Sequence, residues 1–305
     1  MPQLPSDDED TTRVGTSVDF PDVLADLDLE TITEDAAEYA RVRLGETEES
    51  RTQLLAELED MIYEKGEITP HRMDELFLLR FLRARHFKLM PSYKLLVNYC
   101  RFRENNPDYY KINPLDLSFI GDADVLSVLP YTEQTGRRIL IYRIGKWNIN
   151  DFDITEILKA SYATLELGVL EPTAQILGGV VIFDLGGFTM QHAYQVSPKV
   201  VSKIFELIVS SIPIKTYAIH ILNESWVFDT VFNLFKPLLG RRYHEMLFFH
   251  GKNMESLHKH IDPKYLPTVY GGIRPSYPYQ HWFINMKKNK RIVEEMESLG
   301  YDVHV

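Results

Sequence analysis

The central part of the chain alternates short apolar runs with longer amphipathic stretches. Four runs are rich in β-branched and aromatic residues, which is typical of buried strands, at 138–143, 179–185, 217–222 and 246–250. Helical patterns separate them, at 153–170, 197–210 and 225–239. Strands and helices that alternate in this way predict a mostly parallel sheet, with crossover helices that cover both of its faces.

The chain that precedes this α/β region is predicted to be helical. Its amphipathic stretches run over 33–45, 51–66, 74–87 and 90–107. Thr47 or Ser50 is expected to cap the second helix, and Gly45 and Gly66 are suitable stops. A last amphipathic segment over 286–299 closes the chain.

The stretch 225–239 is unusual because both of its sides are apolar. One face carries Phe228, Val231, Phe235 and Leu239, and the other side carries Trp226, Val227, Phe232, Leu234 and Leu238. A helix that is apolar nearly all round is buried on all sides, or it faces something apolar outside its own core. Two interpretations therefore stay open. The stretch is an ordinary core helix, or it is a lid with one face on an apolar ligand and the other on a membrane.

The acidity of the chain belongs to its first fifty residues. Residues 1–50 contain 15 acidic side chains and 3 arginines, a net charge of −12. The whole chain carries −11, so the rest carries +1. We expect this leader to be disordered or loosely attached. The balanced body can still hold a local basic patch of the kind that an anionic headgroup needs.

Composition excludes several classes of protein. With 45% hydrophobic and 25% charged residues, the chain has an ordinary globular composition. No apolar run approaches the ~18–20 residues that a membrane span needs, and the acidic N-terminus does not resemble a signal peptide. The single cysteine, Cys100, excludes an internal disulfide and a multi-cysteine metal site, and it fits a reducing cytosol.

The sequence lacks the common catalytic motifs. It has no P-loop, no G-x-G-x-x-G after a strand, no H-E-x-x-H and no G-x-S-x-G. The spacings of His250, His258 and His260 do not place them on one helical face, so we interpret them as solvated histidines rather than metal ligands. Nothing in the spacing ties Asp184 and His220 to a serine. We therefore expect no enzymatic activity, cofactor, metal or nucleic-acid partner.

Several long motifs, in order along the chain, resemble one family. They are DELFLLRFLRARHFKLMPSYKLL (74–96), GRRILIYRIGKWN (136–148), VIFDLGGFTMQHAYQVSP (181–198), IHILNESWVFDTVFNLFKPLLG (219–240), and HGKN followed by LPTVYGG (250–272). Over about 50–285 the chain closely resembles the CRAL-TRIO family of lipid-transfer proteins. It is most similar to the branch of α-tocopherol transfer protein and cellular retinaldehyde-binding protein.

The chain is expected to have an α/β fold in four parts, of which the acidic leader lies outside the resemblance. A mostly parallel sheet is expected to form the floor of an apolar cavity, and a helical lid at 227–239 is expected to cover it. The parts are a flexible acidic leader (1–45), a helical N-terminal subdomain (46–110), the CRAL-TRIO lipid-binding domain (111–285) and a C-terminal helix and tail (286–305).

The resemblance also implies which side chains line the cavity. They are Leu158, Ser161, Leu165, Phe183, Ile204, Ile208, Ile219, Phe228, Val231 and Phe235. An apolar cavity with few polar groups suits a hydrophobic ligand, which one or two hydroxyls would orient. Ser161 is a candidate for this polar anchor. Alternatively, its hydroxyl bonds back to the backbone of its own helix.

Two further surfaces follow from the resemblance. Shallow membrane contact is expected from Met190, Tyr194, Val227, Val231 and Leu234. Phosphoinositide headgroups are expected in a basic cleft beside the lid, formed by Arg85, Lys94, Lys215 and Arg242. Two positions that are basic in the family are Tyr217 and Met246 here, which weakens the cleft, and Arg241 is a possible compensation.

These features predict a monomeric, cytoplasmic carrier without enzymatic activity. It would bind a small hydrophobic ligand under the lid and release it at phosphoinositide-containing membranes, which it contacts transiently. Tocopherol, a retinoid, a carotenoid or another isoprenoid all stay open, and phospholipid is less favoured. The alternative is a lipid-sensing regulatory or trafficking adaptor that recruits partners through the acidic leader.

Overall fold

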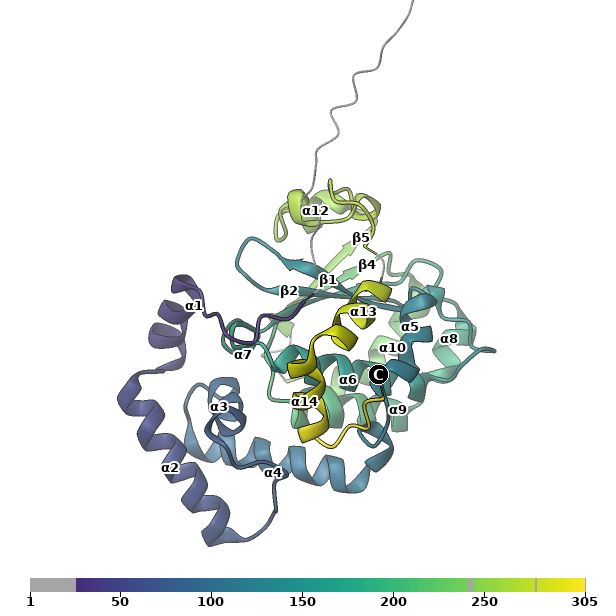
Figure 1. The fold of residues 1–305 in the computed structure, drawn as a ribbon. Helices are drawn as coiled ribbons and strands as arrows, with labels where there is room; N and C mark the ends of the chain where they lie inside the picture. The colour runs from purple at the N-terminus through teal and green to yellow at the C-terminus, as the bar shows by residue number, and fades with distance from the viewer. Residues whose placement is uncertain (1–25, 241–243, 278, 305) are drawn as a thin grey trace, which may run out of the picture.

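The protein, as described by a computed structural model, folds as a helical arm followed by a sheet with helices on both faces (Figure 1). The description covers residues 26–240, 244–277 and 279–304. The helices are α1 (Glu34–Tyr39), α2 (Glu48–Lys65), α3 (Glu75–Ala84), α4 (Leu89–Asn105), α5 (Ser118–Asp122), α6 (Ile154–Val169), α7 (Pro172–Leu177), α8 (Met190–Gln195), α9 (Pro198–Ile204), α10 (Trp226–Phe235), α12 (Met254–His258), α13 (Gln280–Lys288) and α14 (Lys290–Ser298). The strands are β1 (Leu126–Thr132), β2 (Arg138–Arg143), β3 (Gly179–Asp184), β4 (Thr216–Leu222) and β5 (Leu247–Gly251).

The helical arm begins and ends its helices where the local sequence predicts. Thr47 and Ser50, the two candidate caps, act together: each side chain accepts a hydrogen bond from the backbone N–H of the other, at 2.8 and 3.0 Å. Gly45 and Gly66 end their helices in the left-handed conformation, with φ of 77° and 57°. The predicted helices at 33–45 and 51–66 are therefore confirmed.

The sheet has the order β1-β2-β3-β4-β5, and only β1 runs antiparallel to its neighbour. The four predicted strands and the mostly parallel sheet are confirmed. Sequence reasoning missed β1, which contains Pro130. Proline is tolerated there because β1 is an edge strand. The outer side of β1 is also covered, since the Trp282 indole donates to the Val128 carbonyl at 2.8 Å.

The two faces of the sheet bury different cores. Ile139, Ile141, Val180 and Ile182 pack on one face with Leu257 of α12. Tyr142, Leu140, Val181 and Phe183 lie on the other face, toward α5 and α6. Figure 1 shows α12 on one side of the sheet and α6, α9 and α10 on the other. The expectation that helices cover both faces is thus confirmed, and the side that carries α6 and α10 holds the cavity described below.

The C-terminal segment forms two helices, so the prediction of one amphipathic segment over 286–299 was wrong. α13 begins at Gln280, and Asn289 separates it from α14. The ring of Tyr279 explains the earlier start. It lies against Gly121, where an added Cβ would come within 1.6 Å of it. This contact, which only glycine permits, holds the segment on α5 before α13 begins.

A buried charged network joins the helical arm to the rest of the protein. Arg103 of α4 and Glu166 of α6 are each 1% exposed, and their side chains lie 3.3 Å apart. The Arg103 guanidinium also donates to the Leu299 carbonyl after α14, and it lies 3.8 Å from the centre of the Tyr110 ring. One guanidinium therefore joins three distant parts of the chain: α4, α6 and the segment after α14.

Removing this guanidinium should strongly destabilise the fold. Arg103→Met leaves the Glu166 carboxylate buried without its charged partner, so we expect the free energy of unfolding to fall by about 3–5 kcal/mol. Arg101→Met, two residues earlier on α4, removes an exposed ion pair with Glu67 and should cost less than about 1 kcal/mol. Chemical denaturation of both variants measures the difference, and equal losses would contradict a structural role for the buried pair.

Candidate functional site

An apolar cavity of about 150 Å³ lies between the sheet and α6, α9 and α10. β2 and β3 supply its floor, because Tyr142 and Phe183 are register partners on neighbouring strands and their rings stack with centroids 4.9 Å apart. The lining residues are Tyr142, Ile144, Trp147, Ile154, Ile157, Leu158, Ser161, Phe183, Leu185, Phe188, Val196, Ile204, Ile208, Phe228, Val231 and Phe235.

The cavity has one pair of polar side chains with hydroxyl groups. The Tyr142 hydroxyl donates to Ser161 Oγ at 2.9 Å, and the Ser161 hydroxyl donates to the Ile157 carbonyl at 2.7 Å. Burial raises the pKa of Tyr142 to about 12, so the phenol stays neutral at physiological pH. Ser161 thus makes the bond to its own helix that was the alternative to a ligand anchor. The Ser161 oxygen can still accept a hydrogen bond from a ligand, but its hydroxyl hydrogen is already donated to the Ile157 carbonyl.

α10 closes the cavity with the side that carries Phe228, Val231 and Phe235. Val227 and Val231 are buried against Ala193 of α8. Among the described residues, no hydrogen bond or ion pair from a side chain of α10 reaches the rest of the protein. α10 is therefore held by apolar contacts and by its connections in the chain, and such contacts set no unique geometry. This arrangement suits a helix that moves.

The structure brings together eight of the ten side chains predicted to line the cavity. They are Leu158, Ser161, Phe183, Ile204, Ile208, Phe228, Val231 and Phe235. The other two lie elsewhere. Leu165 is one α-helical turn beyond Ser161 and packs against the core of the helical arm. Ile219 pairs with Val181 in the sheet, and it is not part of the lining.

Sequence reasoning missed several aromatic side chains of the lining. Tyr142 could have been found, because strand alternation places it on the same face as the predicted Phe183. Trp147 and Phe188 come from loops after strands, where no periodicity indicates direction. Trp147 is fixed by a hydrogen bond from its indole N–H to the Phe152 carbonyl at 2.8 Å.

The residues predicted to contact membranes divide into two groups. Tyr194 and Leu234 are exposed, and Met190 is half-buried. Val227 and Val231 lie on the inner side of α10 and are buried, so they do not face solvent in this conformation. Three exposed apolar side chains that were not predicted for this role lie close to them in the sequence or on β5: Trp226, Leu238 and Phe249. The outer side of the lid region thus carries exposed apolar side chains in this conformation, two of them predicted and three not.

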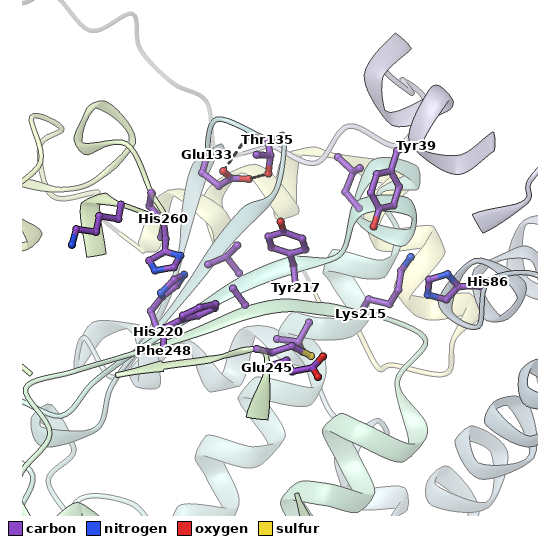
Figure 2. A pocket seen from close by; sticks show the side chains of 17 residues that line it. Tyr39, His86, Glu133, Thr135, Lys215, Tyr217, His220, Glu245, Phe248 and His260 are labelled. Carbon is purple, nitrogen blue, oxygen red and sulfur yellow. Dashed lines mark hydrogen bonds between the residues drawn. The ribbon is translucent and has the colours of Figure 1, made fainter. Parts of the chain in front are cut away.

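A second, larger cavity of about 560 Å³ opens on the opposite face of the sheet (Figure 2). Its lining includes Val180 and Ala218, which alternate with the residues that face α6 and α10. We call it the cleft. It is lined by Tyr39, His86, Glu133, Thr135, Leu177, Val180, Lys215, Thr216, Tyr217, Ala218, His220, Glu245, Met246, Phe248, Lys259, His260 and Ile261.

The cleft contains one of the four basic residues predicted to bind phosphoinositides. Lys215 lines it, but Arg85 and Lys94 do not, although His86 directly after Arg85 does. Arg242 lies outside the described residues, as does Arg241. The cleft is not beside the lid but across the sheet from it. The predicted cluster of four basic residues therefore stays a prediction: of its three described members, Lys215 lines the cleft.

The two positions where this chain departs from the family pattern, Tyr217 and Met246, both line the cleft. The Arg137 guanidinium stacks on the Tyr217 ring at 3.6 Å from its centre. Arg137 is itself buried and donates to the Leu177 carbonyl at 3.0 Å. Its charge therefore lies behind the tyrosine and not at the surface of the cleft.

Histidines form a cluster at one end of the cleft. His220 Nδ1 and His250 Nε2 are 2.9 Å apart, and the His260 ring centre lies 5.2 Å from that of His220. Burial and the neighbouring imidazoles lower the pKa of His220 to about 3 and also lower that of His250, so this pair is neutral. His258 donates to or accepts from none of them; its Nε2 bonds the Tyr270 carbonyl at 2.9 Å. Within the described ranges, no histidine, cysteine and carboxylate group is arranged to hold a metal.

None of the helices in the described ranges is long and apolar enough to cross a bilayer.

Comparison with known proteins identifies the family of the chain. A model of the CRAL/TRIO domain matches residues 123–272. Clavesin-1 of Rattus norvegicus is 32% identical over 254 residues, which are 82% of this chain and 72% of that protein.

Two further relatives have similar coverage. Alpha-tocopherol transfer protein-like of Mus musculus is 32% identical over 82% of this chain and 74% of its own length. Clavesin-2 of Homo sapiens is 30% identical over 82% of this chain and 78% of its own length. The match spans the sheet, the cavity and α10 together, and extends over most of these relatives. The chain therefore belongs to the CRAL/TRIO family of lipid-binding and lipid-transfer proteins.

Proposed function

We propose that this protein is a non-enzymatic carrier that holds one small hydrophobic molecule under α10 and delivers it to membranes. The cavity between the sheet and α10 carries the proposal. Its lining is apolar except for the Tyr142 and Ser161 hydroxyls, and those two side chains already bond each other. Such a site offers burial of hydrocarbon and very little polar recognition.

The volume of the cavity implies that α10 moves when a ligand enters. Pockets for drug-sized ligands have volumes of roughly 300–1,000 Å³, and this cavity has about 150 Å³. Phe228, Val231 and Phe235 of α10 are the side chains that can retreat together, because they belong to one helix held only by apolar contacts. The described conformation is then the closed state, and uptake requires a second, open state.

An isoprenoid is the ligand class that this lining favours. Its hydrocarbon would lie on the stacked rings of Tyr142 and Phe183, and a single polar end would meet the acceptor of Ser161. One relative is named for its likeness to an α-tocopherol transfer protein, and α-tocopherol is a molecule of this class. Tocopherol, retinoids and carotenoids share this chemistry, and the identity of the ligand is open among them.

Delivery to a membrane is supported by the outer side of the lid region. Trp226 is 70% exposed and Leu234 is 37% exposed on α10, and Tyr194 of α8 is 77% exposed. The free energy of the protein falls when exposed apolar side chains of this size enter the interface of a bilayer. Lifting α10 at that interface would also let Val227 and Val231 exchange protein contacts for lipid contacts.

An anionic headgroup at the cleft completes the proposed function. Lys215 and Lys259 are the lysines that line it, and its volume exceeds that of the apolar cavity. A phosphoinositide bound there would direct the carrier to particular membranes. The apolar cavity does not require this second site, so ligand binding and headgroup binding are separable in experiment.

Organic extraction of the protein purified from its own source tests the carrier proposal directly. Mass spectrometry and absorbance should identify one isoprenoid at nearly one molecule per chain. Phospholipid alone, or no ligand in a well-folded protein, would instead favour the lipid-sensing adaptor.

A substitution that fills the cavity should prevent ligand uptake without loss of the fold. We expect Ile208→Phe, which adds volume to the cavity lining, to reduce uptake of a tested retinoid or tocopherol at least about tenfold, since the added ring competes for the same space. Ile284→Phe at an exposed site of α13 is the control. Fluorescence titration measures uptake, and thermal unfolding checks the fold. Unchanged uptake in a folded Ile208→Phe protein would remove this cavity as the ligand site.

A charge on the outer side of α10 should weaken membrane binding while the ligand is retained. Leu234→Asp places a carboxylate where we expect the helix to insert into the bilayer. Burial of one leucine side chain contributes roughly 1.5–3 kcal/mol, so its loss should lower the vesicle partition coefficient about tenfold or more. Asn233→Asp introduces the same charge at the adjacent exposed position and should change partition much less. Vesicle flotation measures both variants, and equal partition of the two would contradict membrane contact through Leu234.

A further inference from the structure

The segment between β4 and α10 is held by polar contacts to β5. The Asn223 backbone N–H donates to the Gly251 carbonyl at 2.7 Å, which continues the pairing of the two strands. Both carboxylate oxygens of Glu224 accept from the Gly251 N–H, at 2.9 and 3.0 Å. A hydrogen bond to a charged acceptor is stronger than one between neutral groups. The chain is therefore fixed to the end of β5 directly before α10 begins.

A second set of contacts fixes the same segment to β3. The Asn223 side chain donates to Asp184 Oδ1 at 2.8 Å, and Asp184 Oδ2 accepts from the Tyr270 hydroxyl at 3.2 Å. Asp184 Oδ1 also accepts from the Gly186 N–H at 2.9 Å. Asn223 has φ of 56°, in the left-handed region, which asparagine tolerates better than most residues. Both the backbone and the side chain of Asn223 thus specify the turn out of β4.

The single residue Ser225 separates this fixed segment from α10. It is exposed, its backbone is extended with φ of −132° and ψ of 172°, and its side chain makes no capping hydrogen bond. The helix that follows is held to its described neighbours by apolar contacts, as shown above. Hinges in proteins are a few residues at the end of an element, which absorb the change in φ and ψ. Ser225 lies at such a position, between polar contacts on one side and apolar contacts on the other.

We propose that Ser225 is the pivot of α10 and that Glu224 is the positioning residue that holds this pivot on β5. The inference rests on the lid movement of the proposed function, and it adds the axis of that movement. The hydrogen bonds of Asn223 and Glu224 persist in the closed and open states, while the apolar contacts of α10 are exchanged. The helix then swings outward about its first turn instead of moving away as a whole.

A pivot at this end determines where the cavity opens. Displacement grows with distance from the pivot, and an α-helix rises about 1.5 Å per residue. A rotation of about 20° would therefore move Phe235 by about 5 Å and Val227 by only about 1 Å. Phe235 lines the cavity, and its ring centre lies 6.0 Å from that of Phe205, in the helical segment that follows α9. The ligand would thus enter and leave between these two rings, at the far end of α10.

Spin labels at two positions on one face of α10 measure the axis. Asp229 and Asn233 are both exposed, and they lie about 6 and 12 Å from Ser225 along the helix. The variants Asp229→Cys and Asn233→Cys are each combined with a reference label at the exposed Lys287 of α13 or Glu59 of α2. Distances between labels are then compared with and without vesicles.

The native cysteine should not interfere with this labelling. Cys100 is buried, and burial raises the pKa of its thiol to about 12. A thiol that is buried and protonated reacts slowly with labelling reagents, because the thiolate is the nucleophile. The full chain can therefore be used without replacing Cys100.

Phosphatidylcholine vesicles that contain phosphatidylserine should displace the label at Asn233 about twice as far as the label at Asp229, because its distance from the pivot is about twice as long. Glu224→Ala removes both acceptors of the Gly251 N–H and should bring this ratio close to one. Glu224→Gln keeps one side-chain oxygen as an acceptor and should restore most of the difference. Glu255→Ala, at an exposed glutamate of α12, is the matched control and should leave the ratio at about two.

The possible results separate the pivot from the carrier. Equal displacements with Glu224 intact would mean that α10 moves as a rigid body, and a larger displacement at Asp229 would place the pivot at the other end. Either result overturns the inference and leaves the carrier standing, as does a ratio that stays at about two in folded Glu224→Ala. The measurement with Glu224 intact does not depend on whether that variant folds. Labels that do not move on vesicles, in a chain that takes up a retinoid or tocopherol, overturn the pivot and the opening at membranes together.

Discussion

The apolar contact of α10 with the sheet and α8 is the interaction on which the site depends. β2 and β3 present Tyr142 and Phe183 toward α6, and α6 covers only part of that face. α10 covers the rest through Phe228, Val231 and Phe235, and the packing stays incomplete, so a cavity of about 150 Å³ remains. Burial of apolar area contributes roughly 25 cal/mol per Å², and it has no preferred direction. A membrane or a hydrophobic ligand can therefore replace these contacts without breaking a hydrogen bond or ion pair between an α10 side chain and the rest of the described protein.

Rigid parts of the structure surround this movable helix. The Arg103–Glu166 network fixes the helical arm and the C-terminal tail to α6, and the Tyr279 ring against Gly121 fixes α13 to α5. Polar and sterically specific contacts thus lie where the protein must keep its shape. Non-specific contacts lie where it must open. The rigid parts and the movable helix therefore differ in the types of residue that make their contacts.

Periodicity predicted the parts of the fold that burial determines. The strand 138–143 and the caps at Thr47 and Ser50 could be read locally, because their signals lie within a few residues. β1 could not, since Pro130 is acceptable only at an edge that the sequence does not reveal. Eight of the ten expected cavity residues assemble because each follows the periodicity of its own element: the face of β3, or one side of α6, of α10 or of the helical segment from α9 to Ile208. The basic cluster stays a prediction, because Arg242 lies outside the described residues and the positions of Arg85 and Lys94 depend on the packing of α3 and α4, which no local pattern specifies.

β5 connects the two cavities of the molecule physically. Phe249 lies on the lid side, with its ring centre 5.5 Å from that of Phe232 in α10. The adjacent Phe248 points to the opposite face, where it stacks on His220 at 5.3 Å and lies 4.3 Å from His260. Strand alternation makes these two rings move together if β5 shifts. A ligand bound in the cleft beside Phe248 can bias α10 only through a difference in the position of β5 between the two states of the lid. Among the described strands, β5 lies at an edge of the sheet and pairs with β4 alone, so fewer backbone hydrogen bonds oppose such a shift than at a central strand.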